Sequence, residues 1–139
     1  MKAIVLGGVA AGMSAASKLK RTLPDAEVRV YERGSFLSYG ACGIPYFVGG
    51  VNDNPDLLIA RSREAFEKQG IQTFLRHEAI TLDPARRVVQ IRDLDQSHVF
   101  EDHYDKLMIA VGCDSVMLPI PGADLPGVFY LKSMEDGLL

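Results

Sequence analysis

The 139-residue chain has no long apolar run and little excess charge of either sign. None of its hydrophobic stretches reaches the roughly 20 residues that a membrane-spanning helix needs. Its net charge at pH 7 is only −3, which gives no reason to expect nucleic acid or an anionic membrane as a partner. Hydrophobic residues still make up 47% of the chain, as in an ordinary soluble protein. We therefore expect one globular domain with a real core.

Cysteine and histidine are scarce. The two cysteines, Cys42 and Cys113, stand far apart in the chain, so there is no Cys-x-x-Cys pair. His98 and His103 have no partners at metal-ligand spacing, and we expect them, like His77, to be solvated surface residues without a bound metal. Reduced thiols in a cytoplasmic protein fit this cysteine usage better than a disulfide framework does.

The clearest pattern lies at the start of the chain. Residues 2–6 form an apolar run typical of a strand buried on both faces. Gly7 and Gly12 then occupy the first and third positions of a G-x-G-x-x-G turn. The free N–H groups of a helix that opens after such a turn suit a pyrophosphate. Residues at helical spacing give this helix one expected inner face: Ala11, Ala15 or Ala16, Leu19 and Leu23.

A second strand and an acidic residue complete the unit. Val28 and Val30 alternate with polar residues and predict a strand that leads to Glu32. An acid about 20 residues beyond the turn can accept hydrogen bonds from ribose hydroxyls. Val9 departs from the pattern, because it replaces the middle glycine that lets the backbone approach a pyrophosphate. The order of elements indicates a dinucleotide site; an ordinary α/β unit without a nucleotide is the alternative.

Residues 35–50 form an unusual segment, rich in glycine and aromatic side chains. Cys42 lies there between Ala41 and Gly43, so other groups could approach its sulfur closely. A short helix beginning near Cys42 would favour the thiolate through its first N–H groups. A lone cysteine is also often a buried structural residue. From these residues alone both interpretations stand, since the sequence does not reveal exposure.

The chain resembles the single-cysteine branch of the FAD-dependent pyridine nucleotide–disulfide oxidoreductases in residues 7–16 and 38–46. Coenzyme A-disulfide reductases, NADH oxidases and polysulfide or persulfide reductases belong to that branch, where the Val9 departure is usual. The resemblance implies an α/β, Rossmann-like three-layer FAD/NAD(P)-binding domain with a parallel sheet and an antiparallel β-meander. It also implies that Cys42 is catalytic and lies beside the isoalloxazine ring of FAD. The residues that it places at the cofactor are Gly7, Gly8, Val9, Ala10, Ala11, Gly12, Glu32, Arg33, Ser38, Ala79, Ala110, Val111 and Gly112.

The middle of the chain predicts one further helix and a group of strands. Ser62 can cap a helix that runs to about Gln69 and stops at Gly70, with Ala65 and Phe66 inward. A strand is expected over residues 71–75. Three more strands, over residues 77–83, 88–92 and 98–104, would form the antiparallel meander.

The last third predicts a second buried strand over residues 107–112, which resembles the family's second flavin motif with Val111 in place of threonine. Cys113 directly follows that strand, so we expect it to be a protected structural residue. Residues 128–131 predict a last short strand, and residues 133–136 the start of a linker helix.

The resemblance covers nearly the whole chain but only the N-terminal part of the family's architecture. We therefore expect residues 1–139 to be an incomplete FAD-binding segment, without the NAD-binding domain, the second FAD segment or the dimerisation domain. The parent protein, expected to be a homodimer, would carry electrons from NAD(P)H through FAD and Cys42 to a small-thiol disulfide such as coenzyme A disulfide. Cys42 has no nearby cysteine partner, which favours a mixed disulfide with the small thiol.

Two other functions are open from the sequence. The parent could be an NADH oxidase that reduces oxygen through a Cys42 sulfenate. The chain could also be a redox-inactive nucleotide-binding fragment, and we expect the isolated fragment to be inactive in turnover. Lys18, Lys20 and Arg21 could meet the phosphates of coenzyme A, or they could be a solvated helix face.

Overall fold

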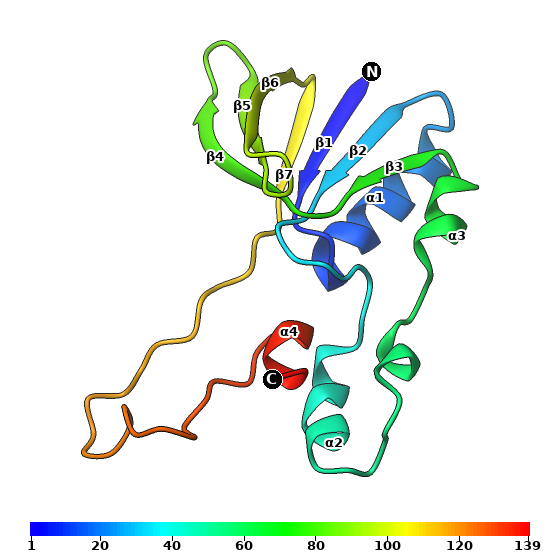
Figure 1. Ribbon diagram of the computed structural model, residues 1–139. Helices are drawn as coiled ribbons and strands as arrows, with labels where there is room; N and C mark the ends of the chain where they lie inside the picture. The colour runs from blue at the N-terminus through cyan, green and yellow to red at the C-terminus, as the bar shows by residue number, and fades with distance from the viewer.

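A four-stranded parallel sheet forms the centre of the molecule in the computed structural model, which describes all 139 residues (Figure 1). Its strands are β1 (Lys2–Leu6), β2 (Glu27–Tyr31), β3 (Ile71–Phe74) and β7 (Lys106–Ile109), in the spatial order β3-β2-β1-β7. β1 pairs on both sides and is buried, as its apolar sequence predicts. Because all four strands are parallel, their carboxyl ends meet at one edge of the sheet.

Helix α1 (Ala10–Thr22) packs on one face of this sheet. Its Met13 and Ala16 share a buried cluster with Val5, Val28 and Val30. α1 is the longest helix, with 13 residues, and no helix combines the length and apolar character needed to cross a membrane.

The buried face of α1 agrees with the predicted one at Ala16 and Leu19, which pack in or against the core, and differs from it at Ala11 and Leu23. Gly12, Met13, Ala16 and Ser17 point inward, whereas Ala11 is exposed. The cause is the close approach of Gly12 to the carbonyl oxygen of Gly7, where any Cβ would clash. Turning Gly12 toward the sheet rotates Ala11 outward. Leu23, also predicted inward, lies past the end of the helix and is 45% exposed.

The antiparallel meander predicted from the sequence is confirmed on the other face of the sheet. It consists of β4 (His77–Asp83), β5 (Val88–Asp93) and β6 (His98–His103), with a register shift in β4 between Ala79 and Thr81. Val89 and Ile91 of β5 form a buried cluster with Ile4, Leu6 and Tyr31 of the parallel sheet. The expected three-layer α/β fold is therefore present.

A buried carboxylate ties the meander to the sheet. Asp102 of β6 accepts hydrogen bonds from the Lys2 ammonium, the Tyr31 hydroxyl (2.8 Å) and the Arg29 guanidinium (3.1 Å). Burial acts to raise the pKa of Asp102, but these partners outweigh it and lower that pKa below its ordinary value of 3.8. Asp102 is therefore ionised when folded, and it links β6 to both β1 and β2.

The helix predicted after Ser62 is also confirmed. α3 (Arg63–Glu67) begins where the Ser62 hydroxyl accepts a hydrogen bond from the Ala65 N–H at 3.3 Å. Phe66 is buried against the core, and Gly70 adopts a φ of +76° as the chain turns into β3.

Two short helices lie together away from the sheet (Figure 1). One is α2 (Ile44–Val48), which follows the 3₁₀ turn η1 (Ala41–Gly43). The other is α4 (Met134–Gly137), which confirms the helix predicted near Ser133. A second 3₁₀ turn, η2 (Pro55–Leu58), lies in the connection to α3.

The two strand predictions of the last third need correction. β7 ends at Ile109 and is not buried: Met108 is 39% exposed and Ile109 56%. The reason is that β7 pairs only with β1 and forms the edge of the sheet. Residues 128–131 form no strand, because no neighbouring backbone pairs with them, and their side chains are exposed. Residues 110–133 instead form one extended arm that leads to α4.

Candidate functional site

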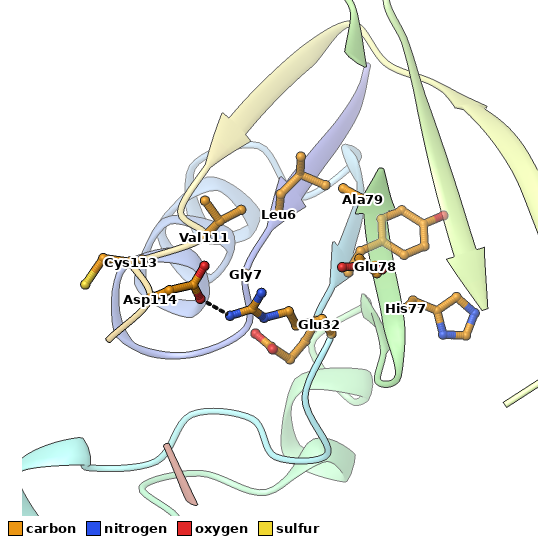
Figure 2. A pocket seen from close by; sticks show the side chains of 12 residues that line it. Leu6, Gly7, Glu32, His77, Glu78, Ala79, Val111, Cys113 and Asp114 are labelled. Atoms are coloured by element: carbon orange, nitrogen blue, oxygen red, sulfur yellow. Dashed lines mark hydrogen bonds and ion pairs between the residues drawn. The ribbon is translucent and has the colours of Figure 1, made fainter. Parts of the chain in front are cut away.

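A cleft of about 280 Å³ opens at the carboxyl edge of the parallel sheet (Figure 2). The ends of β1 and β2, the start of β4 and the segment after β7 contribute its walls. Six of the residues that the sequence assigned to a cofactor lie together here: Gly7, Glu32, Arg33, Ala79, Val111 and Gly112. Six further lining residues were not assigned: Leu6, Tyr31, His77, Glu78, Cys113 and Asp114.

The glycine-rich turn brings backbone against backbone at the floor of this cleft. Gly7 has a φ of +103°, and any Cβ there would clash with the Ala110 carbonyl oxygen. A Cβ on Gly8 would clash with the Leu37 side chain, and one on Gly12 would clash with the Gly7 carbonyl. The turn therefore requires glycine at all three positions, and it leaves a cradle of backbone groups.

The N-terminus of α1 faces outward from this turn without a protein cap. Val9 precedes the helix and makes no side-chain hydrogen bond to it, and the first turn contains no acidic residue. The first N–H groups of a helix lack partners within the helix and carry partial positive charge. This end of α1 can therefore accept an anionic group.

Glu32 connects the turn to the end of β2. One of its carboxylate oxygens accepts a hydrogen bond from the Gly8 N–H at 2.6 Å, and the other accepts one from the Gly34 N–H at 2.7 Å. A carboxylate has about four acceptor sites, so both oxygens can still accept from sugar hydroxyls.

Arg33 and Asp114 form an ion pair in this cleft, with Nη2 and Oδ1 2.6 Å apart (Figure 2). The Arg33 hydrogen bond and charge lower the pKa of Asp114. Both side chains are well exposed, so the pair is weak and can open. Sequence reasoning missed Asp114 because its partner lies 81 positions away.

The prediction that His77 is a solvated surface residue is wrong. Its Nδ1 lies 2.6 Å from the Leu75 carbonyl oxygen, and its ring stacks beside Tyr31 with centroids 6.1 Å apart. His98 and His103 are exposed, as predicted. The available signal for the missed cleft residues was topological: the carboxyl ends of neighbouring parallel strands share one edge.

Both cysteines are exposed. Cys42 lies in η1, immediately before α2, so its interpretation as a buried structural thiol is wrong. Cys113 was expected to be protected behind a buried strand, which is also wrong, because β7 is an exposed edge strand. Its side chain projects away from Gly7 and the middle of the cleft (Figure 2).

A second cleft, of about 400 Å³, lies on the other side of the glycine-rich turn. Arg21 and Arg61 line it, and no acidic residue does. The Arg21 side chain forms no ion pair or hydrogen bond within the chain. The Arg61 guanidinium donates to Gln69 Oε1 at 3.2 Å and lies 4.9 Å from the centre of the Phe66 ring. The other lining residues are Val9, Ala10, Met13, Ser14, Ser17, Ser38, Tyr39, Gly40, Ala60 and Phe66.

The other residues predicted to bind cofactor or coenzyme A lie in the second cleft or outside both clefts. Val9, Ala10 and Ser38 line the second cleft rather than the first. Ala11 is exposed on the first turn of α1, and the Ala110 carbonyl lies over Gly7. Of the three predicted basic residues only Arg21 lines the second cleft. The Lys20 ammonium donates to the Ala26 carbonyl at 2.7 Å, and Lys18 is exposed outside the cleft.

The parallel sheet, the glycine-rich turn and the meander on the opposite face define the Rossmann-like class of FAD- and NAD(P)-binding oxidoreductase domains. Within that class, the chain matches the profile of the family described as pyridine nucleotide-disulphide oxidoreductase over residues 1–138, and it belongs to that family.

Three similar proteins illustrate this membership. The chain is 37% identical to an NAD(P)H sulfur oxidoreductase (CoA-dependent) of Pyrococcus abyssi, over 97% of this chain and 29% of that protein. It is 34% identical to a coenzyme A disulfide reductase of Staphylococcus haemolyticus, over 97% of this chain and 30% of that protein. The water-forming NADH oxidase of Lactobacillus brevis, solved with NADH, superposes with a TM-score of 0.90 at 33% identity, over 99% of this chain and 31% of that one. The chain thus spans less than a third of the length of these relatives.

Proposed function

We propose that residues 1–139 are the N-terminal FAD-binding segment of a flavoprotein that transfers electrons from NAD(P)H, through FAD and Cys42, to a small-thiol disulfide. One observation carries this proposal: the exposed Cys42 lies two residues after Gly40, and Tyr39 and Gly40 line the basic second cleft. This nearness in the chain supports a role for the Cys42 sulfur as a nucleophile toward an anionic carrier bound in that cleft.

The first cleft fits the adenosine and pyrophosphate parts of FAD. Backbone approaches so closely at Gly7 and Gly12 that no side chain intrudes on the cradle. The N-terminus of α1, which borders both the glycine-rich turn and the second cleft, would offer free N–H groups to the pyrophosphate. Glu32 would accept from the ribose hydroxyls, and Arg33 and the Ala79 backbone would border the adenosine. Ala110, Val111 and Gly112 would close the opposite side. When bound, FAD would supply two electrons taken as hydride from NAD(P)H.

Cys42 would do the sulfur chemistry. Its thiolate attacks one sulfur of the disulfide, which forms a mixed disulfide and releases the other half as a thiolate. Two electrons and a proton then break the mixed disulfide, release the second thiol and return the Cys42 thiolate. No second cysteine lies beside Cys42, so the mixed disulfide has no competitor within the chain.

The second cleft suggests coenzyme A as the small thiol. Arg21 has no partner in the chain, and an unpaired guanidinium is suited to bidentate recognition of phosphate. Arg61, Ser14, Ser17 and Ser38 add further hydrogen-bond donors in the same cleft. Coenzyme A carries phosphates and a thiol on one flexible chain, so it could occupy this cleft and reach Cys42.

The test is a covalent adduct with coenzyme A disulfide, mapped by peptide mass spectrometry. We expect one adduct per chain, mainly at Cys42, with one equivalent of coenzyme A released. Arg21→Ala should slow this adduct roughly tenfold or more, as expected for a lost charge-assisted contact. Since Cys113 is also exposed, it is the internal control. Equal labelling of both cysteines, or disulfide turnover that survives Cys42→Ser in the parent enzyme, would contradict the proposal.

An NADH oxidase is the second candidate, supported by the 33% identity to the Lactobacillus brevis enzyme. In that case Cys42 would pass through a sulfenate on the way to water. Oxygen uptake by the full-length parent without disulfide consumption would favour this alternative.

A further inference from the structure

Helix α4 is short, but its start is strongly fixed. The Ser133 hydroxyl accepts from the Asp136 N–H at 3.3 Å, and the Asp136 carboxylate accepts from the Ser133 N–H at 2.7 Å, which together form a capping box. The backbone hydrogen bonds from Ser133 and Lys132 lower the pKa of Asp136. A helix of four residues is thus held in place at the end of the long arm.

Glu135, inside this capping box, reaches the segment that leads to Cys42. Glu135 Oε1 accepts a hydrogen bond from the Ser35 N–H at 2.7 Å. The preceding amide, Gly34, donates to Glu32 at 2.7 Å. Two consecutive N–H groups are therefore held by two carboxylates, one at the first cleft and one on α4. A Cβ on Gly34 would lie 2.9 Å from Glu135 Oε1, so the arrangement is tight.

Two other contacts extend this hold to the helix that follows Cys42. Ile44 of α2 and Met134 of α4 are each 1% exposed where the two helices pack. A Cβ on Gly137 would lie 2.9 Å from Ile44 Cγ2, so α4 touches α2 through bare backbone. Tyr39 lies on the other side, and burial followed by the Glu135 charge raises its pKa. α4 thus contacts the chain before Cys42 at Ser35 and the helix after it at Ile44. The Tyr39 end of the turn is held by the backbone of residues 58–60.

We propose that α4 is a positioning element for Cys42, and that Glu135 and Gly137 are its positioning residues. The proposal rests on the proposed function only in treating Cys42 as the nucleophile. The carboxylate of Glu135 and the bare backbone of Gly137 fix the Cys42 turn relative to Glu32 and therefore relative to the first cleft. Neither residue takes part in the chemistry.

The first measurement is amide hydrogen exchange in the 139-residue chain. Glu135→Ala should speed exchange of the Ser35 amide about tenfold or more, because a hydrogen bond to a charged acceptor is lost. If α4 positions the turn, exchange at Gly40 and Gly43, which flank Cys42, should accelerate as well. Glu135→Gln keeps an acceptor oxygen and should restore part of the protection. Glu67→Ala, which removes an exposed carboxylate from the short helix α3, is the matched control.

The second measurement compares two disulfides at Cys42. The rate at which coenzyme A disulfide reacts with Cys42 should depend on the geometry of the turn. The rate with 2,2′-dithiodipyridine, which carries no phosphate, should not depend on it. Glu135→Ala and Gly137→Ala should each lower the ratio of the two rates at Cys42 roughly tenfold, as expected for a misplaced nucleophile. The same ratio at Cys113 should not change. Gly137→Ala raises helix propensity, so a change in the rate ratio would come from disturbed packing against Ile44 and not from unfolding of α4.

The outcomes separate this inference from the proposed function. Unchanged exchange at Gly40 and Gly43 in Glu135→Ala would overturn the positioning role, whatever the reactivity of Cys42. A wild-type Cys42 with no preference for coenzyme A disulfide would count against the proposed function alone, and the exchange data would then decide the inference. A merely structural role for α4 would lower the unfolding temperature and change both cysteines together, which would also overturn the proposal.

Discussion

The Glu32 carboxylate joins the glycine-rich turn to the segment that leads to Cys42. It accepts from Gly8 on one side and from Gly34 on the other, so both oxygens are oriented by fixed backbone N–H groups. A ribose that binds here meets a carboxylate that has already lost its freedom to rotate. Such preorganisation lowers the entropic cost of binding.

We expect Glu32→Ala to raise the dissociation constant for FAD by about 10- to 100-fold. A hydrogen bond to a charged acceptor contributes about 1.5–3 kcal/mol, and every 1.4 kcal/mol is a factor of ten. Quenching of flavin fluorescence during titration of the chain measures this affinity. Glu67→Ala is the control, and thermal unfolding of the apo variant separates a lost contact from a damaged turn. An unchanged dissociation constant would count against the ribose role.

At the scale of elements, the sequence predicted the units whose partners are local. The strand of residues 2–6, the turn with Gly7 and Gly12, and the second strand follow one another along the chain, and all are present as predicted. The meander is equally local, because each strand pairs with the next. The Ser62 and Ser133 caps were readable for the same reason.

The predictions that failed depend on distant neighbours. Residues 107–112 have the apolar sequence of a buried strand, but burial requires layers on both faces, and β7 lies at the sheet edge. Residues 128–131 have strand-forming side chains without a partner backbone. Likewise, the Arg33–Asp114 pair and the contact of Glu135 with Ser35 join residues 81 and 100 positions apart, which no local pattern encodes.

The link between β6 and the parallel sheet should depend on pH through Asp102. Its pKa is lowered in the folded chain, so its contribution to stability is fully present above the ordinary value of 3.8 and is lost as the pH falls through the lower folded pKa. We expect Asp102→Asn to cost about 2–3 kcal/mol at neutral pH, as for hydrogen bonds to a charged group.

Urea unfolding at neutral pH and near pH 3 tests this expectation, with the exposed Asp25→Asn as the control. The difference between wild type and Asp102→Asn should shrink as the pH falls below 3.8, because the unfolded wild-type chain then gains a proton at Asp102 that the folded chain resists. A difference that stays constant with pH would show that Asp102 contributes through packing alone.

For the whole molecule, the structure holds one glycine-rich turn that opens a helix on a parallel sheet. Gly112 follows the edge strand β7 much as Gly7 follows β1, but it leads into the extended arm and not into a helix. One such unit binds one dinucleotide. If FAD occupies the first cleft, no equivalent place remains in these 139 residues for NAD(P)H.

We therefore expect the 139-residue chain, supplied with FAD and coenzyme A disulfide, to consume no NAD(P)H in the steady state. Absorbance of the reduced nicotinamide measures consumption, and chemical reduction of the bound flavin by dithionite is the positive control. Continuous consumption that depends on the chain would contradict this expectation.

The arm of residues 110–133 also has a consequence for how α4 is held. The arm forms no helix or strand, and most of its side chains are exposed. α4 therefore packs on α2 as a separate segment that the arm connects to the sheet. A flexible tether maintains an effective concentration that is roughly millimolar at best, and this advantage vanishes when the tether is cut. One proteolytic nick in the arm would make the association bimolecular, and simple dilution would then release α4 while the sheet and its glycine-rich turn stay folded.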